Sequence, residues 1–111
     1  MSLILSRRDL DFLLFEWLDV DALLHRSRFN HLDRAMFDQI LDMCETMATD
    51  KFAPIYQKGD QIEPVFDGET GHCLPEVRDA LTAFAVAGLF AAGQSMEYGG
   101  LQLPASVERA A

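Results

Sequence analysis

Apolar residues recur at steps of three and four between residues 37 and 55, and this spacing constrains the fold more than any other feature of the sequence. The series consists of Phe37, Ile40, Leu41, Cys44, Met47, Ala48, Phe52 and Ile55. Such spacing gathers apolar side chains on one face of an α-helix. The acids interleaved with them suit the solvent face; they are Asp38, Asp42, Glu45 and Asp50. We therefore predict an amphipathic helix that begins at or beside Asp33. Its inward residues are expected to be Phe37, Leu41, Cys44, Met47, Ala48 and Phe52.

A proline interrupts this helical pattern. Pro54 has no N–H to donate, so we expect the helix to end or kink near Lys51. A kink is favoured because the apolar spacing continues through Ile55 and Tyr56. Gly59 then offers a stop, although the polar run 60–63 could prolong the helix slightly.

Weaker patterns predict the elements on either side. Residues 8–18 predict a short helix capped by Ser6, residues 20–25 a helical turn, and residues 26–32 a connection. Turn signals between residues 64 and 74 predict a small hairpin or tight loop. A further helix runs from Pro75 to Gly88, and another could begin near Ser106. The expected inward face of the helix that starts at Pro75 consists of Leu74, Val77, Leu81, Phe84 and Ala85. The expected fold is an all-α helical bundle with a minor hairpin.

Size and charge limit the domain organisation and the partners. The chain has 111 residues, half of them hydrophobic, which suffices for one core and predicts a single domain over residues 1–111. The chain has nine basic and eighteen acidic residues. This balance argues against a nucleic-acid partner, because binding of phosphates requires clustered Lys and Arg side chains. The longest weakly polar stretch, residues 83–93, is about half a membrane span. We expect no membrane span and a cytoplasmic location.

The reactive residue types form no catalytic or metal-binding constellation. His72 stands beside Cys73, but adjacent side chains diverge and no further ligand has suitable spacing. Cys44 and Cys73 are too few for a disulfide scaffold, so reduced thiols are expected. His25 and His31 lie in an arginine-rich turn that suits solvated or capping roles. We assign no catalytic residue and no metal ligand.

Bulky apolar residues outnumber what a small helical core can bury. The residues concerned are Phe12, Phe15, Trp17, Phe84, Phe90 and Leu101. We therefore expect self-association, docking to further domains, or a large exposed apolar patch.

Three sequence motifs together resemble one enzyme family. Residues 88–104 contain Glu-Tyr-Gly-Gly followed by Leu-Gln-Leu-Pro, which looks like the loop of acyl-CoA dehydrogenases that follows a helix ending in glycine. Phe52-Ala53-Pro54 with Asp60 resembles the long helix of that family. Residues 8–16 are similar to the opening of the branch that includes methylmercaptopropionyl-CoA dehydrogenases. The resemblance covers nearly the whole chain, but only the family's N-terminal helical domain.

The resemblance implies a partial role in a flavoenzyme. Family members oxidise an acyl-CoA thioester and pass hydride to FAD, using a middle domain and a C-terminal domain that supply most flavin contacts and the catalytic base. The chain would then be the N-terminal part of a longer enzyme and bind no FAD alone. Tyr98, Gly99 and Gly100 would lie nearest the acyl-CoA cavity. The alternative is a stand-alone helical protein-interaction module.

Local chemistry adds one expectation about this loop. Two consecutive glycines permit positive φ and close backbone approach. We predict positive φ at Gly99 or Gly100, and Tyr98 at the edge of the core with its hydroxyl reaching solvent or a polar partner.

Overall fold

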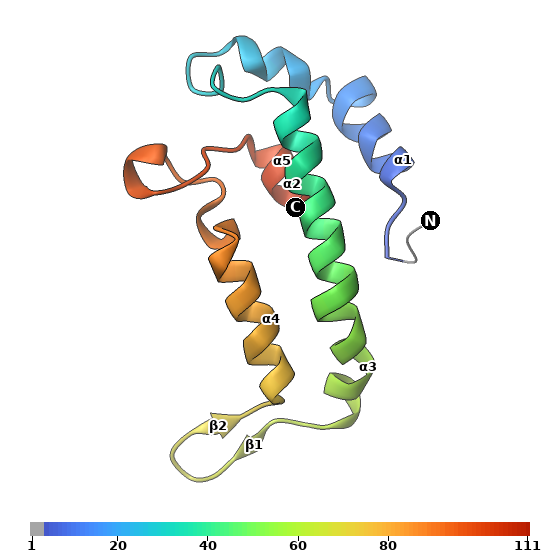
Figure 1. Cartoon of the computed structure of the whole chain (residues 1–111), viewed down its shortest axis with the longest axis vertical. Helices are drawn as coiled ribbons and strands as arrows, with labels where there is room; N and C mark the ends of the chain where they lie inside the picture. The colour runs from blue at the N-terminus through green and yellow to red at the C-terminus, as the bar shows by residue number, and fades with distance from the viewer. Residues whose placement is uncertain (1–3) are drawn as a thin grey trace.

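The computed structural model describes residues 4–111 as a set of helices with one small hairpin (Figure 1). The molecule is long and thin, with extents of 52 × 36 × 17 Å. Its radius of gyration is 16.7 Å, whereas about 13 Å is expected for a compact domain of this length. The all-α class predicted from the sequence is confirmed, but the helices do not close into a compact bundle.

The N-terminal helix starts where the sequence predicts. α1 (Arg7–Asp11) continues directly into a π-helical segment, η1 (Phe12–Trp17). The hydroxyl of Ser6 accepts a hydrogen bond from the backbone N–H of Asp9 at 3.3 Å, which confirms the predicted cap. The helical turn expected next is η2 (Val20–His25).

The central helix begins at its predicted cap and runs past its proline. Asp33 accepts a hydrogen bond from the N–H of Met36 at 2.8 Å and starts α2 (Arg34–Met47). The chain then passes through a π-helical segment, η3 (Ala48–Phe52), into α3 (Ala53–Gln61). The helix therefore does not end near Lys51. The wider π-helical turn before Pro54 accommodates the missing donor, and the helix also continues two residues past Gly59.

The predicted hairpin connects the two long helices. β1 (Val65–Phe66) pairs antiparallel with β2 (Gly71–His72), with Val65 opposite His72. Gly68 has a φ of +103°, which suits the turn between the strands. The chain then doubles back as α4 (Pro75–Val86). Lys58 Nζ lies 2.6 Å from Glu76 Oε1 and joins α3 to the first turn of α4.

α4 begins and ends as predicted, but its inward face is only partly correct. Pro75 occupies the first turn, and Gly88, with a φ of +79°, follows the end of the helix. Val77 and Phe84 are half-buried, as expected, whereas Leu81 and Ala85 are exposed. Ala80 is buried instead. α4 packs against η3 and η4, and the face that carries Ala80 is the one that is covered.

The last third of the chain returns to the upper end of the molecule. It consists of η4 (Leu89–Ala91), η5 (Met96–Tyr98) and α5 (Ala105–Ala110), and α5 lies beside α2 (Figure 1). The helix expected near Ser106 is α5, and it contributes to the core because Val107 is fully buried.

One core cluster occupies this upper end, and it is built by the two ends of the described chain. Its buried members are Leu14, Phe15, Val20, Leu32, Phe37, Leu41, Ala92, Leu103 and Val107. The inward residues predicted along the central helix face the right way, but their burial decreases: Phe37 and Leu41 are buried, whereas Cys44, Met47, Ala48 and Phe52 are half-buried. α3, β1 and β2 contribute no buried residue.

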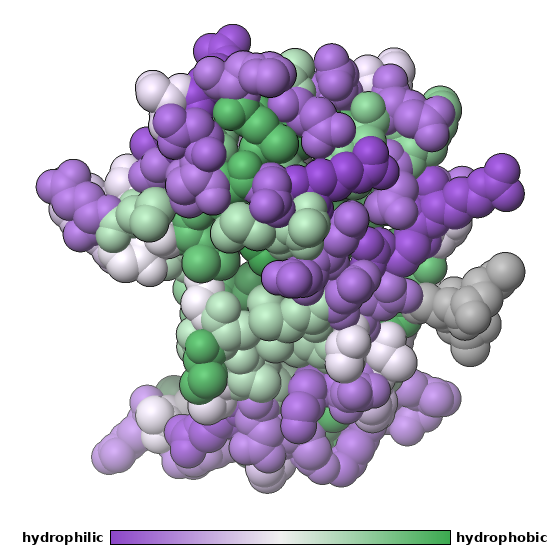
Figure 2. All heavy atoms as spheres, turned by 45° about the horizontal axis from the view of Figure 1, so that its top comes forward, coloured by the Kyte–Doolittle hydropathy of each residue, from purple (hydrophilic) through white to green (hydrophobic). Residues whose placement is uncertain are grey.

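Many large apolar side chains remain exposed, including three of the six that the sequence singles out. The accessible surface is 8013 Å², compared with about 6200 Å² for an average folded monomer of this mass. Trp17, Phe90 and Phe12 are 70%, 67% and 52% exposed, while Phe15 is buried and stacks under the Arg34 guanidinium at 4.0 Å. Figure 2 shows apolar side chains gathered between two polar ends of the molecule.

Candidate functional site

The loop that carries the predicted site residues is tied together by its own backbone. Gly99 follows η5 with a φ of +82°, which confirms the expected positive φ. The N–H of Gly100 donates to the carbonyl of Ser95 at 3.1 Å, and the N–H of Gln102 donates to the carbonyl of Gln94 at 3.0 Å. The loop is thus a closed unit between η4 and α5.

Gly100 is needed for a close approach between two backbone segments. A Cβ at this position would lie 2.1 Å from the carbonyl oxygen of Gln94 and 2.7 Å from that of Ala91. Real Cβ atoms essentially never come so close, so a side chain here would displace the loop. A Cβ at Gly99 would meet nothing within 4 Å, so glycine is favoured at this position by its positive φ alone.

Gln102 holds this loop against the N-terminal third of the chain, and sequence reasoning missed it. Its side-chain amide donates to the backbone carbonyl of Arg28 at 2.7 Å, and its Oε1 accepts from the N–H of Met96 at 3.2 Å. Its φ is +56°, a conformation that costs about 1–3 kcal/mol in a residue other than glycine. The polar side chain between Leu101 and Leu103 was the one available signal.

Tyr98 is not at the edge of the core. Its side chain is 76% exposed, so the tip of the loop projects into solvent. Tyr98, Gly99 and Gly100 are brought together, as their adjacency in sequence requires. The four grooves described below are lined by residues of other segments.

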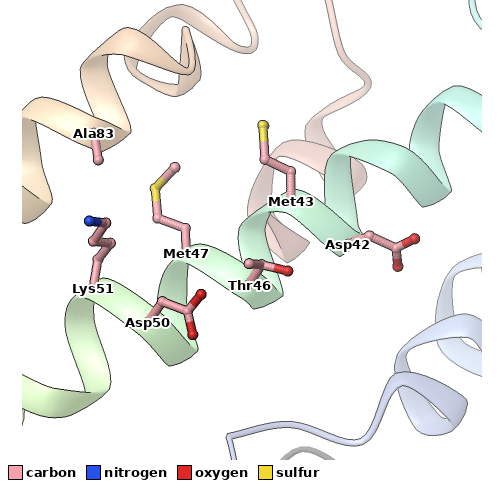
Figure 3. Close-up of a pocket in the computed structure, with 7 residues that line it drawn as sticks. All are labelled: Asp42, Met43, Thr46, Met47, Asp50, Lys51 and Ala83. Carbon is pink, nitrogen blue, oxygen red and sulfur yellow. The ribbon is translucent and has the colours of Figure 1, made fainter.

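The central helix carries an apolar groove whose border includes two acids and one lysine, Lys51. This groove has a volume of 360 Å³, and its lining includes Met43 and Met47, with Ala83 contributed by α4 (Figure 3). Asp42 and Asp50 stand along one side of it. A smaller groove of 130 Å³ shares Met47, and a third of 350 Å³ lies beside Ala48, Phe52 and Tyr56.

A fourth groove runs along the outer face of α4. It has a volume of 420 Å³ and is lined by Cys73, Val77, Arg78, Leu81, Thr82, Ala85 and Val86. The aromatic contacts of α4 lie elsewhere, because Phe84 stacks edge-to-face on Phe90 at 4.9 Å and on Phe52 at 6.5 Å.

Arg7 joins α1 to the acidic face of α2. It is hydrogen-bonded to Asp42, and its guanidinium lies 3.5 Å from Glu45 and 4.0 Å from Asp38. Partial burial acts to lower the pKa of Arg7, but the bond to Asp42 and the surrounding carboxylates raise it overall. The acids predicted to be merely solvated therefore include ion-pair partners of one arginine.

Neither cysteine is bonded. Cys73 is exposed, whereas Cys44 is half-buried, and its burial raises the pKa of its thiol. Within residues 4–111, no three His, Cys, Asp or Glu side chains are grouped so that they could hold a metal ion. In the same range, no helix has the length and apolar character needed to cross a membrane.

His72 pairs with an acid of the hairpin turn. Its Nε2 lies 2.6 Å from Oδ2 of Asp67, whose Oδ1 accepts the N–H groups of Thr70 and Glu69 at 2.8 Å and 2.9 Å. The bond from Thr70, together with those from His72 and Glu69, lowers the pKa of Asp67 from 3.8 to about 2. The residues are exposed, so this arrangement organises a turn and forms no enclosed site.

We expect the hairpin turn to lose stability in acid. Because the pKa of Asp67 is lower in the folded turn than in the unfolded chain, its contribution is complete above the unfolded pKa near 3.8 and is lost as the pH falls through about 2. An NMR pH titration should show the amide signals of Glu69 and Thr70 moving with a midpoint near the lower value. Asp67→Asn should abolish that transition, and a midpoint at the ordinary value would contradict the hydrogen-bonded turn.

Comparisons with protein-family models, curated proteins and solved structures find no match for this chain. The resemblance to acyl-CoA dehydrogenases is carried by the sequence motifs alone.

Proposed function

We propose that this chain is the N-terminal helical domain of a flavin-dependent acyl-CoA dehydrogenase. In that role it forms one wall of the cavity for acyl-CoA and FAD and contributes no catalytic residue. The resemblance of residues 8–16, 52–60 and 88–104 supports this proposal. The third of these segments forms the end of a helix, a glycine with positive φ and a loop closed around Gly99 and Gly100.

The thinness of the molecule is the observation that carries the proposal. Its shortest extent is 17 Å, close to the width of about 13–15 Å that the Cα atoms of two packed helices span. Ligand sites usually surround most of a small molecule, which requires walls on both sides. A chain this thin, with many exposed large apolar side chains, is suited to supplying one wall against other domains.

The proposal assigns the loop residues a shaping role. Tyr98 projects from the loop, and Gly99 and Gly100 let the backbone follow its closed path beneath it. In the full enzyme, Tyr98 would lie against the acyl-CoA cavity, while FAD and the base would be held by the middle and C-terminal domains of the family. The proposal includes a cytoplasmic location, where free thiols stay reduced.

We expect the isolated chain to bind no FAD. Stoichiometric binding of flavin needs contacts that the resemblance assigns to the missing domains, and the chain has no glycine-rich dinucleotide motif. Titration of FAD with the chain at micromolar concentration should leave flavin fluorescence unchanged. Stoichiometric quenching would contradict the assignment of the flavin contacts to other domains.

The genomic reading frame provides the direct test of the proposed function. We expect the frame to continue beyond the codon for Ala111 through several hundred further residues. The expressed full product should purify with FAD and reduce it when acyl-CoA is added. A product that carries no flavin would overturn the proposal.

The methionine-lined groove favours a second candidate, the helical protein-interaction module. Met43 and Met47 supply adaptable apolar contacts, and Asp42 and Asp50 lie beside them. Lys51 also lines the groove, and Asp42 is paired with Arg7, so the apolar contacts are its main feature. Such a groove suits a partner helix with an apolar face. An amphipathic peptide that binds tightly in the absence of flavin, and loses binding when both methionines become glutamine, would favour this candidate.

A further inference from the structure

The outer face of α4 differs in charge from the rest of the molecule. The chain has eighteen acids and nine basic residues, yet the described residues that line the α4 groove include no carboxylate and one arginine, Arg78. The same face exposes large apolar side chains, since Leu81 is 45% and Val86 is 83% exposed. It therefore combines apolar contact area with freedom from negative charge.

We propose that this face binds a second copy of the chain, with the two α4 helices antiparallel about a two-fold axis at Leu81. Each copy carries a net charge of −9, so two copies repel one another wherever acidic surfaces meet. The residues that line the α4 groove allow close approach without adding a carboxylate of their own to the contact. A symmetric contact also uses the same patch on both copies, which is the usual form of a dimer interface.

The spacing of side chains along α4 suits this arrangement. Val77, Leu81 and Ala85 are four residues apart and form one stripe along the helix. With Leu81 on the axis, Val77 meets the partner's Ala85, so that a larger side chain packs against a smaller one. Thr82 is also small and permits close contact between the helices.

The basic residue of the groove gains a partner in the dimer. Arg78 stands opposite the partner's Phe84, one turn or less from the end of that helix at Val86. The C-terminus of a helix carries a partial negative charge that favours a nearby cation. Each Arg78 therefore stabilises the C-terminal end of α4 in the other copy, and the two-fold symmetry produces two such contacts.

The loop proposed to shape the acyl-CoA cavity stays free in such a dimer. None of residues 97–100 lines the α4 groove, so dimerisation at α4 leaves them available for the proposed function.

Sedimentation of the full chain at several concentrations and salt levels tests the proposal. We expect a reversible dimer at high micromolar concentration. Its dissociation constant should be lower in about 300 mM NaCl than in about 20 mM NaCl, because salt screens the repulsion between the two copies. A strict monomer at about 200 µM in both buffers would overturn the proposal. So would a dimer that weakens with salt, which would indicate charge attraction between the copies.

Two charge-matched variants locate the interface. Leu81→Glu and Met43→Glu each add one negative charge at an exposed apolar position, the first on the α4 face and the second in the methionine groove. We expect Leu81→Glu to raise the dissociation constant at least tenfold and Met43→Glu to change it less than threefold. The reverse order would place the interface elsewhere and contradict the proposal.

Crosslinking provides a measurement that does not depend on a destabilising charge. In a Cys73→Ser background, Leu81→Cys should form a disulfide-linked dimer rapidly under copper-phenanthroline oxidation, because the two thiols meet on the axis. Val86→Cys, exposed on the same helix but away from the axis, should crosslink at least tenfold more slowly. Faster crosslinking at position 86 than at position 81 would exclude this register.

Discussion

Replacing Phe37 with alanine is expected to reduce the free energy of unfolding by about 3–5 kcal/mol. Phe37 is fully buried on α2 and belongs to the core cluster that joins the N-terminal helix to α5. Truncation removes the contacts of the ring and leaves a cavity between these elements. Urea denaturation followed by circular dichroism gives the difference directly, and the loss should be a large fraction of the total stability.

A matched substitution on the same helix separates burial from helix propensity. Gln39 is exposed on α2, so Gln39→Ala should change stability by less than about 0.5 kcal/mol. If Phe37→Ala leaves too little folded protein, the milder Phe37→Leu can be measured instead and should still cost more than Gln39→Ala. Similar effects for positions 37 and 39 would contradict the assigned inward face.

Gly100→Val is expected to cost at least about 1–3 kcal/mol, the usual range for overpacking. The new Cβ would overlap the carbonyl oxygen of Gln94 at 2.1 Å, and backbone atoms yield less readily than a flexible side chain. The loop must therefore shift as a unit. Thermal and urea denaturation should both show the loss.

Gly59→Val is the control for the valine substitution. A Cβ at Gly59 would meet nothing within 4 Å, and valine has a slightly better helix propensity than glycine. Its stability should stay level or rise. In a reconstructed full-length enzyme, Gly100→Val should reduce acyl-CoA turnover more than it reduces stability, because it misplaces a cavity wall. Normal turnover per folded molecule would remove the loop from the proposed site.

Elements defined by local chemistry were predictable from the sequence. The caps at Ser6 and Asp33, the hairpin after Pro64 and the end of α4 at Gly88 all follow from residues within a few positions of one another. Hydrophobic spacing also gave the buried face of α2, because Phe37 and Leu41 are large and unambiguous. These signals need no knowledge of what packs against the helix.

Features that depend on distant partners were not predictable. The apolar spacing along α4 predicted that Leu81 faces inward, whereas Ala80 is buried and Leu81 is exposed, because packing against other elements decides which face is covered. The role of Gln102 depends on the carbonyl of Arg28, which lies far away in the sequence. The solvent exposure of Tyr98 likewise results from the path of the whole loop, and the tyrosine itself does not specify it.

The division of the core between the two ends of the described chain has a consequence for the order of folding. All buried members of the cluster come from residues 14–41 and 92–107, while residues 42–91 leave the core and return. Closing so long a loop carries an entropic cost that rises by about 0.6 kcal/mol with each doubling of its length. The helix–hairpin–helix excursion consists of contacts between neighbouring elements, which form quickly. When this segment forms first, its two helices lie side by side and bring residues 14–41 close to residues 92–107. The segment that contributes least to the core thereby allows the core to assemble.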